Sequence, residues 1–168
     1  MSRFSAFFHE AGINNTKEVS EMGYLKSGIV ALSVCAFVGA TAYAEEKDPI
    51  APRVPGDQRA AAKAMKNPVA KTPENIAKGK AIFEGKGTCF NCHGVSGKGD
   101  GPAGQILNPS PRNFTNAKFH KARTDGEFFW VIKNGSAGTG MVPLIGTAIT
   151  EEEAWYVITY ERTFEGKP

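Results

Sequence analysis

The chain has 168 residues, of which 22% are charged and 41% hydrophobic, and its formal net charge at pH 7 is +3. So slight a positive charge argues against a nucleic-acid-binding protein. The first 44 residues hold three basic and three acidic side chains, so the remaining 168 − 44 = 124 residues keep the balance of +3. That length predicts one small domain.

Residues 1–44 are predicted to be a secretory signal peptide. Lys26 precedes the uncharged stretch Ser27 to Ala44, which ends in Ala42-Tyr43-Ala44. A basic start, an apolar stretch and a small-x-small site together predict cleavage after Ala44 and export to the periplasm. Met22 is an alternative start that would give a leader of ordinary length. The uncharged stretch has 18 residues, at the lower limit for crossing a bilayer, so an uncleaved anchor is the alternative.

Residues 45–71 form a proline- and alanine-rich N-terminal extension. Its prolines surround an alanine-rich segment from Gln58 to Lys66. This pattern predicts one short helix in a tail that either wraps the domain or extends into solvent.

A longer helix is predicted to begin at Pro73. Thr72 is suited to cap its first turn, and the missing N–H of proline costs nothing at the first helical position. Gly79 and Phe83 share one face, and the helix is expected to end near Gly85 or Gly87. It therefore delivers the chain to the next motif.

That motif is Cys89-Phe90-Asn91-Cys92-His93, the Cys-x-x-Cys-His signature of c-type haem attachment. Its two thiols can each add to a haem vinyl group, and the adjacent imidazole then meets the iron. Structural zinc would need four ligands, and beyond the leader only His120 remains as a further Cys or His. A thioredoxin-like redox pair would need a strand-helix-strand setting that the flanks do not provide.

Since Cys35 lies in the predicted leader, both remaining cysteines are committed to haem and no disulfide is expected. The glycine-rich segment 94–104 is predicted to be a loop that approaches the haem closely. An axial histidine usually donates its second ring N–H to a carbonyl or carboxylate, and the Pro102 carbonyl is the predicted acceptor. Arg112 is predicted either to pair with a haem propionate or to be an ordinary surface arginine.

Two capping boxes predict the last two helices. Thr124 and Glu127 begin a short helix that ends at Asn134-Gly135, and Thr150 and Glu153 begin a C-terminal helix. Within the first, the Trp130 indole N–H is a candidate donor to a propionate, with simple core packing as the alternative. In the second, the inward residues are expected to be Ala154, Val157, Ile158 and Tyr160. A glycine-rich loop from 135 to 143, which holds Met141, separates the two helices.

Taken together, these elements from Thr72 to Thr163 resemble the class I monohaem c-type cytochromes. The resemblance implies an all-α fold for residues 72–168, with three main helices and loops wrapped around one covalently bound haem c and its iron. It also implies His93 as the proximal iron ligand and Met141 as the distal one. The first and last helices should cross, with Gly79 and Phe83 opposite Trp155 or Tyr156.

Met141 can be weighed on chemistry as well. Beyond the leader the only other methionine is Met65, which precedes the haem helix, and the rival sixth ligand is His120. His/Met ligation is the electron-transfer form of haem iron, and it leaves no position for a substrate. We therefore expect a periplasmic single-electron carrier, not an enzyme. The alternatives are a haem subunit of a respiratory oxidoreductase complex and a gas-binding or peroxidatic haem protein.

The expected partners are a redox donor and acceptor that bind briefly, with a membrane involved only through an uncleaved leader or a membrane-bound partner. Six basic residues from just before the haem motif to the start of the Met141 loop could form a ring that steers acidic partners, or an ordinary solvated surface. They are Lys86, Lys98, Lys118, Lys121, Arg123 and Lys133. Acidic residues gather at the C-terminus instead: Glu151, Glu152, Glu153, Glu161 and Glu165.

Overall fold

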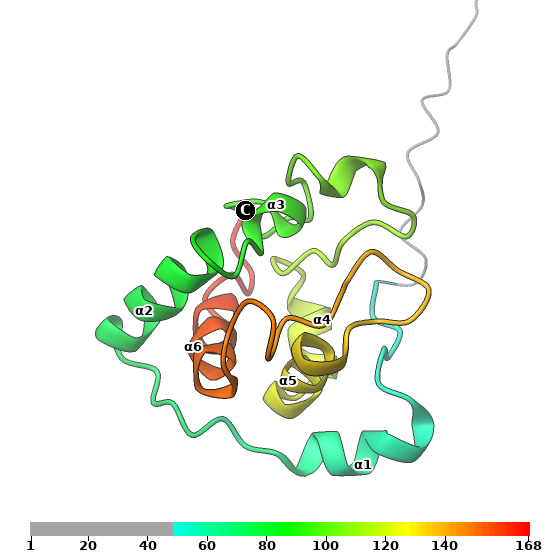
Figure 1. The fold of residues 1–168 in the computed structure, drawn as a ribbon, viewed down its shortest axis with the longest axis horizontal. Helices are drawn as coiled ribbons and strands as arrows, with labels where there is room; N and C mark the ends of the chain where they lie inside the picture. Colours follow the sequence, from blue (N-terminus) through cyan, green and yellow to red (C-terminus); the bar gives the residue numbers. More distant parts are fainter. Residues whose placement is uncertain (1–48) are drawn as a thin grey trace, which may run out of the picture. The chain divides into compact units, whose positions relative to one another are not determined.

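The computed structural model describes residues 49–168, so the predicted leader, with Cys35 and Met22, lies outside the described residues. The described chain is helical (Figure 1), and its only β pairing is an isolated bridge between Ile145 and Ile149. This confirms the all-α prediction. The helices are α1 (Gly56–Ala64), α2 (Pro73–Glu84), α3 (Phe90–His93), the 3₁₀ turn η1 (Gly104–Ile106), α4 (Ala117–Ala122), α5 (Asp125–Asn134) and α6 (Glu151–Glu161).

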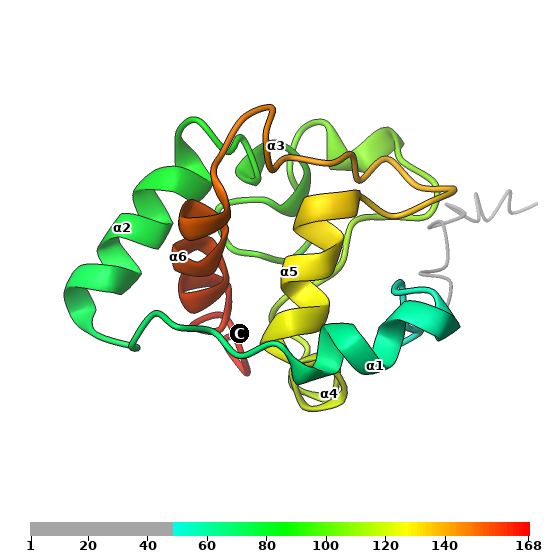
Figure 2. The ribbon, with the colours of Figure 1, turned by 60° about the horizontal axis from the view of Figure 1, so that its bottom comes forward.

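Helices α2 and α6 pack against each other at an angle, as Figures 1 and 2 show. Gly79 is the point of closest approach, because it lies directly against the backbone of Tyr156. One turn later, Phe83 is fully buried and meets Tyr160 edge-on at 5.4 Å between ring centroids. The predicted crossing is confirmed, and Tyr156 is the residue that faces Gly79.

Helix α2 begins as its sequence predicts. The Thr72 hydroxyl accepts a hydrogen bond from the Asn75 N–H, and Pro73 occupies the first helical position. After Gly85, the Gly87 N–H donates to the Ile82 carbonyl and turns the chain toward Cys89. The short helix α3 then presents Cys92 and His93 one residue apart.

Both predicted capping boxes are present. In α5 the Thr124 hydroxyl and the Glu127 carboxylate exchange hydrogen bonds with each other's backbone N–H, and Thr150 and Glu153 do the same in α6. The four residues expected to face inward from α6 are all buried, together with Thr159 and Glu161.

Helix α4 was not predicted. Its six residues contain one pair of buried side chains, Phe119 and His120, which is too short a pattern to show helical periodicity. Its signal is the cap: the Asn116 side chain accepts hydrogen bonds from the N–H groups of Lys118 and Phe119.

Residues 49–71 wrap the domain, and we call this segment the N-terminal strap. Its helix α1 lies beside α5 (Figure 2), where Ala62 is 1% exposed and its carbonyl lies against Gly126. Farther along, the Asn67 side-chain amide donates to Thr159 Oγ1 at 3.0 Å on α6. The strap therefore contacts both α5 and α6. Between residues 49 and 168, no helix combines the length and apolarity needed to cross a membrane.

Candidate functional site

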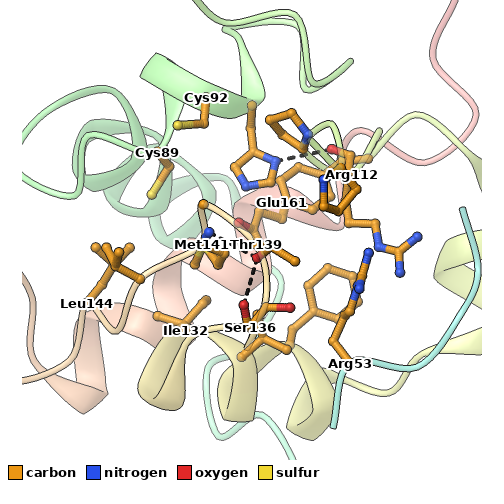
Figure 3. A pocket seen from close by; sticks show the side chains of 18 of the residues that line it. Arg53, Cys89, Cys92, Arg112, Ile132, Ser136, Thr139, Met141, Leu144 and Glu161 are labelled. Atoms are coloured by element: carbon orange, nitrogen blue, oxygen red, sulfur yellow. Dashed lines mark hydrogen bonds between the residues drawn. The ribbon is translucent and has the colours of Figure 1, made fainter. Parts of the chain in front are cut away.

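The predicted haem residues border one cavity. Cys89, Cys92, His93 and Met141 all line it. Figure 3 shows Cys89 and Cys92 close together on its wall, with Met141 reaching it from the glycine-rich loop. The volume of this cavity is about 190 Å³. Apolar side chains supply much of the remaining wall: Leu107, Phe114, Phe128, Val131, Ile132 and Leu144.

His93 is held by both its ring face and its ring nitrogen. It stacks on Phe114 with 4.4 Å between ring centroids, and its Nδ1 lies 3.1 Å from the Arg112 carbonyl. The acceptor predicted here, Pro102, was wrong: Pro102 is exposed, and the chain returns through residues 109–114 to place Arg112 beside the imidazole. Burial lowers the pKa of His93 to about 4, although the Arg112 carbonyl favours the protonated form. The ring is therefore neutral, with Nε2 available to a metal.

The two thiols lie at the start and within the single turn of α3. Both are free, and Cys89 Sγ donates weakly to the Gly87 carbonyl at 3.5 Å. Burial raises the pKa of Cys89 to about 12, with a further contribution from the carboxylate of Glu161. Cys89 is thus not a reactive thiolate. Their common position on the cavity wall suits attachment to one edge of a porphyrin.

The loop that carries Met141 is fixed by its own backbone. The Met141 N–H donates to Thr139 Oγ1 at 3.1 Å, and the Met141 carbonyl accepts from the Ser136 N–H at 2.9 Å. Gly135 begins this turn with φ +74° and lies too close to the Met141 carbonyl for a side chain. The Met141 sulfur is therefore presented from a constrained loop. Met65, by contrast, lies in the strap and packs against Gly126 of α5.

His120 does not line the cavity. It is 4% exposed, its Nε2 lies 2.5 Å from the Phe114 carbonyl, and its Nδ1 lies 3.1 Å from Arg162 Nη1. The Phe114 carbonyl can only accept and the guanidinium can only donate, so Nε2 carries the proton and Nδ1 accepts. This geometry requires neutral imidazole and removes His120 as the rival sixth ligand.

The same geometry predicts a pH effect on stability. Burial lowers the pKa of His120 below its ordinary 6.5. The hydrogen bond to the Phe114 carbonyl opposes this shift, whereas the charge of Arg162, itself paired with Asp125, lowers the pKa further. The unfolded chain therefore binds a proton at a higher pH than the folded protein, so the free energy of unfolding should fall as pH drops below about 6.5. Denaturation of the holoprotein between pH 7.5 and 5 should show a smaller fall for His120→Gln. Equal pH slopes for the two proteins would contradict this assignment.

Trp130 lies away from the cavity lining. Its indole N–H donates to Gln58 Oε1 in the strap at 2.8 Å, so the predicted bond to a propionate is wrong. Arg112 does line the cavity, and its Nη2 donates to the Ala51 carbonyl at 2.7 Å. Its pairing with a propionate stays a prediction.

Sequence analysis did not assign four residues with ionisable side chains to the cavity: Arg53, Arg123, Glu127 and Glu161. Glu161 is 4% exposed, and its Oε2 has no hydrogen-bond partner in the described chain. Burial raises the pKa of Glu161 to about 8, although the nearby charge of Arg162 acts to lower it. Its signal was available, since Glu161 follows Val157 and Ile158 at helical spacing on the inward face of α6.

The six basic residues do not form one ring. Lys86 pairs with Glu153 at 2.5 Å, Lys133 pairs with Glu151 at 2.6 Å, and Arg123 lines the cavity. Lys98, Lys118 and Lys121 stay exposed, without an ion-pair partner in the described chain. Two of the predicted steering charges are thus neutralised by the acidic start of α6.

The residues present fit a covalently bound haem. Two thiols and a neutral imidazole border one apolar cavity, which a thioether sulfur reaches from another loop. Zinc is not supported, because residues 49–168 bring no three His, Cys, Asp or Glu side chains into a cluster that could hold a metal ion.

A match to a family model agrees with this fit. Residues 76–164, just over half of the chain, match the family described as Cytochrome c. A chain of a reducing HAO-like protein complex from Kuenenia stuttgartiensis is similar in structure, with 30% identity and a TM-score of 0.51, over 58% of this chain and 47% of that one. Cytochrome CL from the marine methylotroph Methylophaga aminisulfidivorans is 22% identical, with a TM-score of 0.42, over 55% and 57%. The match thus spans about half the length of each. The comparison with curated proteins finds no match.

Proposed function

Because this chain belongs to the cytochrome c family, whose members carry covalently attached haem c, we propose that it is a periplasmic carrier of single electrons with His93 and Met141 as axial iron ligands. Electron transfer through haem is what the family implies. The ligand pair, the compartment and the free carrier role are the finer parts of the proposal.

One observation carries the ligand pair. His93 and Met141 come from segments 48 positions apart (141 − 93), yet both line the cavity that holds the two thiols. Each is oriented by the chain itself, His93 through the Arg112 carbonyl and Met141 through Thr139. When bound, the haem supplies an iron that gains and loses one electron. The residues of this chain hold it in an apolar cavity and keep the imidazole neutral.

Thioether ligation favours ferrous iron and raises the reduction potential. If both axial positions are filled by the protein, no position is open for a substrate or gas. The protein then needs only brief contact with a donor and an acceptor. Exposed Lys98, Lys118 and Lys121 support, at most, modest attraction to acidic partners.

Absorption spectra of the purified holoprotein test this proposal. We expect the oxidised form to show a sulfur-to-iron charge-transfer band and the reduced form to keep its spectrum under carbon monoxide. A missing band together with carbon monoxide binding would instead favour the gas-binding or peroxidatic alternative.

The predicted leader makes a separate claim. Export followed by cleavage after Ala44 predicts a mature protein that begins at Glu45, which intact-mass measurement of the holoprotein from the periplasmic fraction would detect. Retention of residues 27–44 in a membrane fraction would favour the uncleaved anchor.

The alternative role, a haem subunit of an oxidoreductase complex, is favoured by the similarity to a chain of a multiprotein complex. Purification under mild conditions distinguishes the two roles. A free carrier should elute as a single polypeptide, whereas a stoichiometric second polypeptide would support the subunit role.

A further inference from the structure

The N-terminal strap borders the haem cavity, although the family match begins only at residue 76. Ala51, Arg53 and Val54 form part of the cavity wall, and Val54 is 2% exposed. A segment outside the matched region is thus built into the cofactor site.

Two arginines of the domain hold the strap in this position. Arg112 Nη2 donates to the Ala51 carbonyl at 2.7 Å, and Arg123 Nη2 donates to the neighbouring Ile50 carbonyl. Both arginines also line the cavity. Figure 3 shows Arg53 and Arg112 on the same side of it, across from Cys89 and Leu144. The strap contacts therefore gather three guanidinium groups at one end of the cavity.

The carboxylates of the cavity wall do not pair with Arg53. Glu127 lies 3.8 Å from Arg123 and already accepts from the Thr124 N–H, and burial raises the pKa of Glu161 to about 8. Among residues 49–168, no carboxylate lies within ion-pair distance of Arg53. A guanidinium without a carboxylate partner beside apolar walls favours a bound anion.

We propose that Arg53 binds a propionate of the covalently attached haem, beside Arg112 and Arg123, so that the N-terminal strap is part of the cofactor site. A haem propionate is opposite in charge to the Arg53 guanidinium. A guanidinium suits a carboxylate because it can donate two parallel hydrogen bonds. This proposal needs only the haem of the family and does not depend on ligation by Met141.

The strap has further anchors that would transmit this contact. Beyond Arg53, the strap is fixed through Gln58 to Trp130 and through Asn67 to Thr159. A propionate bound to Arg53 would therefore tie haem position to strap docking. A cation held near the haem also favours the reduced state, so Arg53 should raise the reduction potential.

Three holoprotein variants test the proposal: Arg53→Gln, Arg53→Lys and the control Lys63→Gln. Lys63 is an exposed residue of the same strap and its replacement removes the same charge, but it does not line the cavity. The measurements are the midpoint potential from pH 5 to 9, the propionate bending mode in the resonance Raman spectrum, and hydrogen exchange of the strap amides.

We expect Arg53→Gln to lower the potential, shift the propionate band and speed exchange at residues 50–54, while Lys63→Gln changes none of these. Arg53→Lys should have a midpoint potential close to that of the wild type, because the positive charge is kept. It should still shift the propionate band, because an ammonium cannot form the paired hydrogen bonds. A propionate band and potential in Arg53→Gln that match those of the control would overturn the proposal. If Arg53→Gln does not yield holoprotein, Arg53→Lys decides: a wild-type propionate band would overturn it.

Discussion

Replacing Met141 with alanine is expected to allow the haem iron to bind carbon monoxide. Met141 is the only methionine of residues 49–168 that lines the cavity, and its truncation removes the proposed sulfur ligand. The oxidised variant should lose the sulfur-to-iron charge-transfer band, and the reduced variant should bind carbon monoxide. Its midpoint potential should fall by on the order of 0.1 V or more, within the roughly 0.8 V that axial ligands span.

Met65→Ala is the matched control, because it makes the same change at the other methionine of the described chain. Met65 packs on α5 at Gly126, outside the cavity wall, so its loss should reduce stability without altering the spectrum. A charge-transfer band that survives in Met141→Ala would mean that Met141 is not the ligand.

The features that could be predicted from the sequence are those whose physics is local. The haem motif places two thiols and an imidazole within five residues, so no distant contact is needed to define it. The two capping boxes each join residues three apart, and both formed as expected. Gly79 could be placed at the crossing only because the family resemblance supplied a partner helix.

The contacts that surround the haem residues could not be predicted, since each of them joins residues far apart in the chain. The His93 imidazole bonds to the carbonyl of Arg112, nineteen residues later, because the loop returns and the Phe114 N–H donates to the Gly97 carbonyl. The partner of Trp130 is Gln58, 72 residues earlier. Nothing in the residues around Arg53 distinguishes it from a surface arginine, and only the folded strap brings it to the cavity.

This separation also explains why the strap matters to the site. The family match covers the haem motif and the Met141 loop, but one end of the cavity is completed by residues 51–54. Two arginines within the matched region donate to the backbone of the strap, so the charge near the haem and the closure of the cavity depend on the same contacts.

Gly79→Ala is expected to destabilise the holoprotein strongly, because the backbones of α2 and α6 touch at this position. An added Cβ would lie 2.0 Å from the Tyr156 carbonyl oxygen and 2.8 Å from the Tyr160 Cβ. The helices must separate to admit it, at a cost of about 3 kcal/mol, the upper end for overpacking. This exceeds the roughly 1 kcal/mol by which alanine is favoured over glycine inside a helix. The free energy of unfolding from denaturant titration measures the difference.

Gly56→Ala is the matched control, since nothing lies within 4 Å of a Cβ at the start of α1. It should leave the free energy of unfolding unchanged or slightly raised, and equal values for the two variants would contradict close packing at Gly79.

The effect of Gly79→Ala should also reach the haem. Helix α2 leads directly to Cys89, while α6 places Glu161 in the cavity wall, so helices forced apart at Gly79 must shift one side of the site against the other.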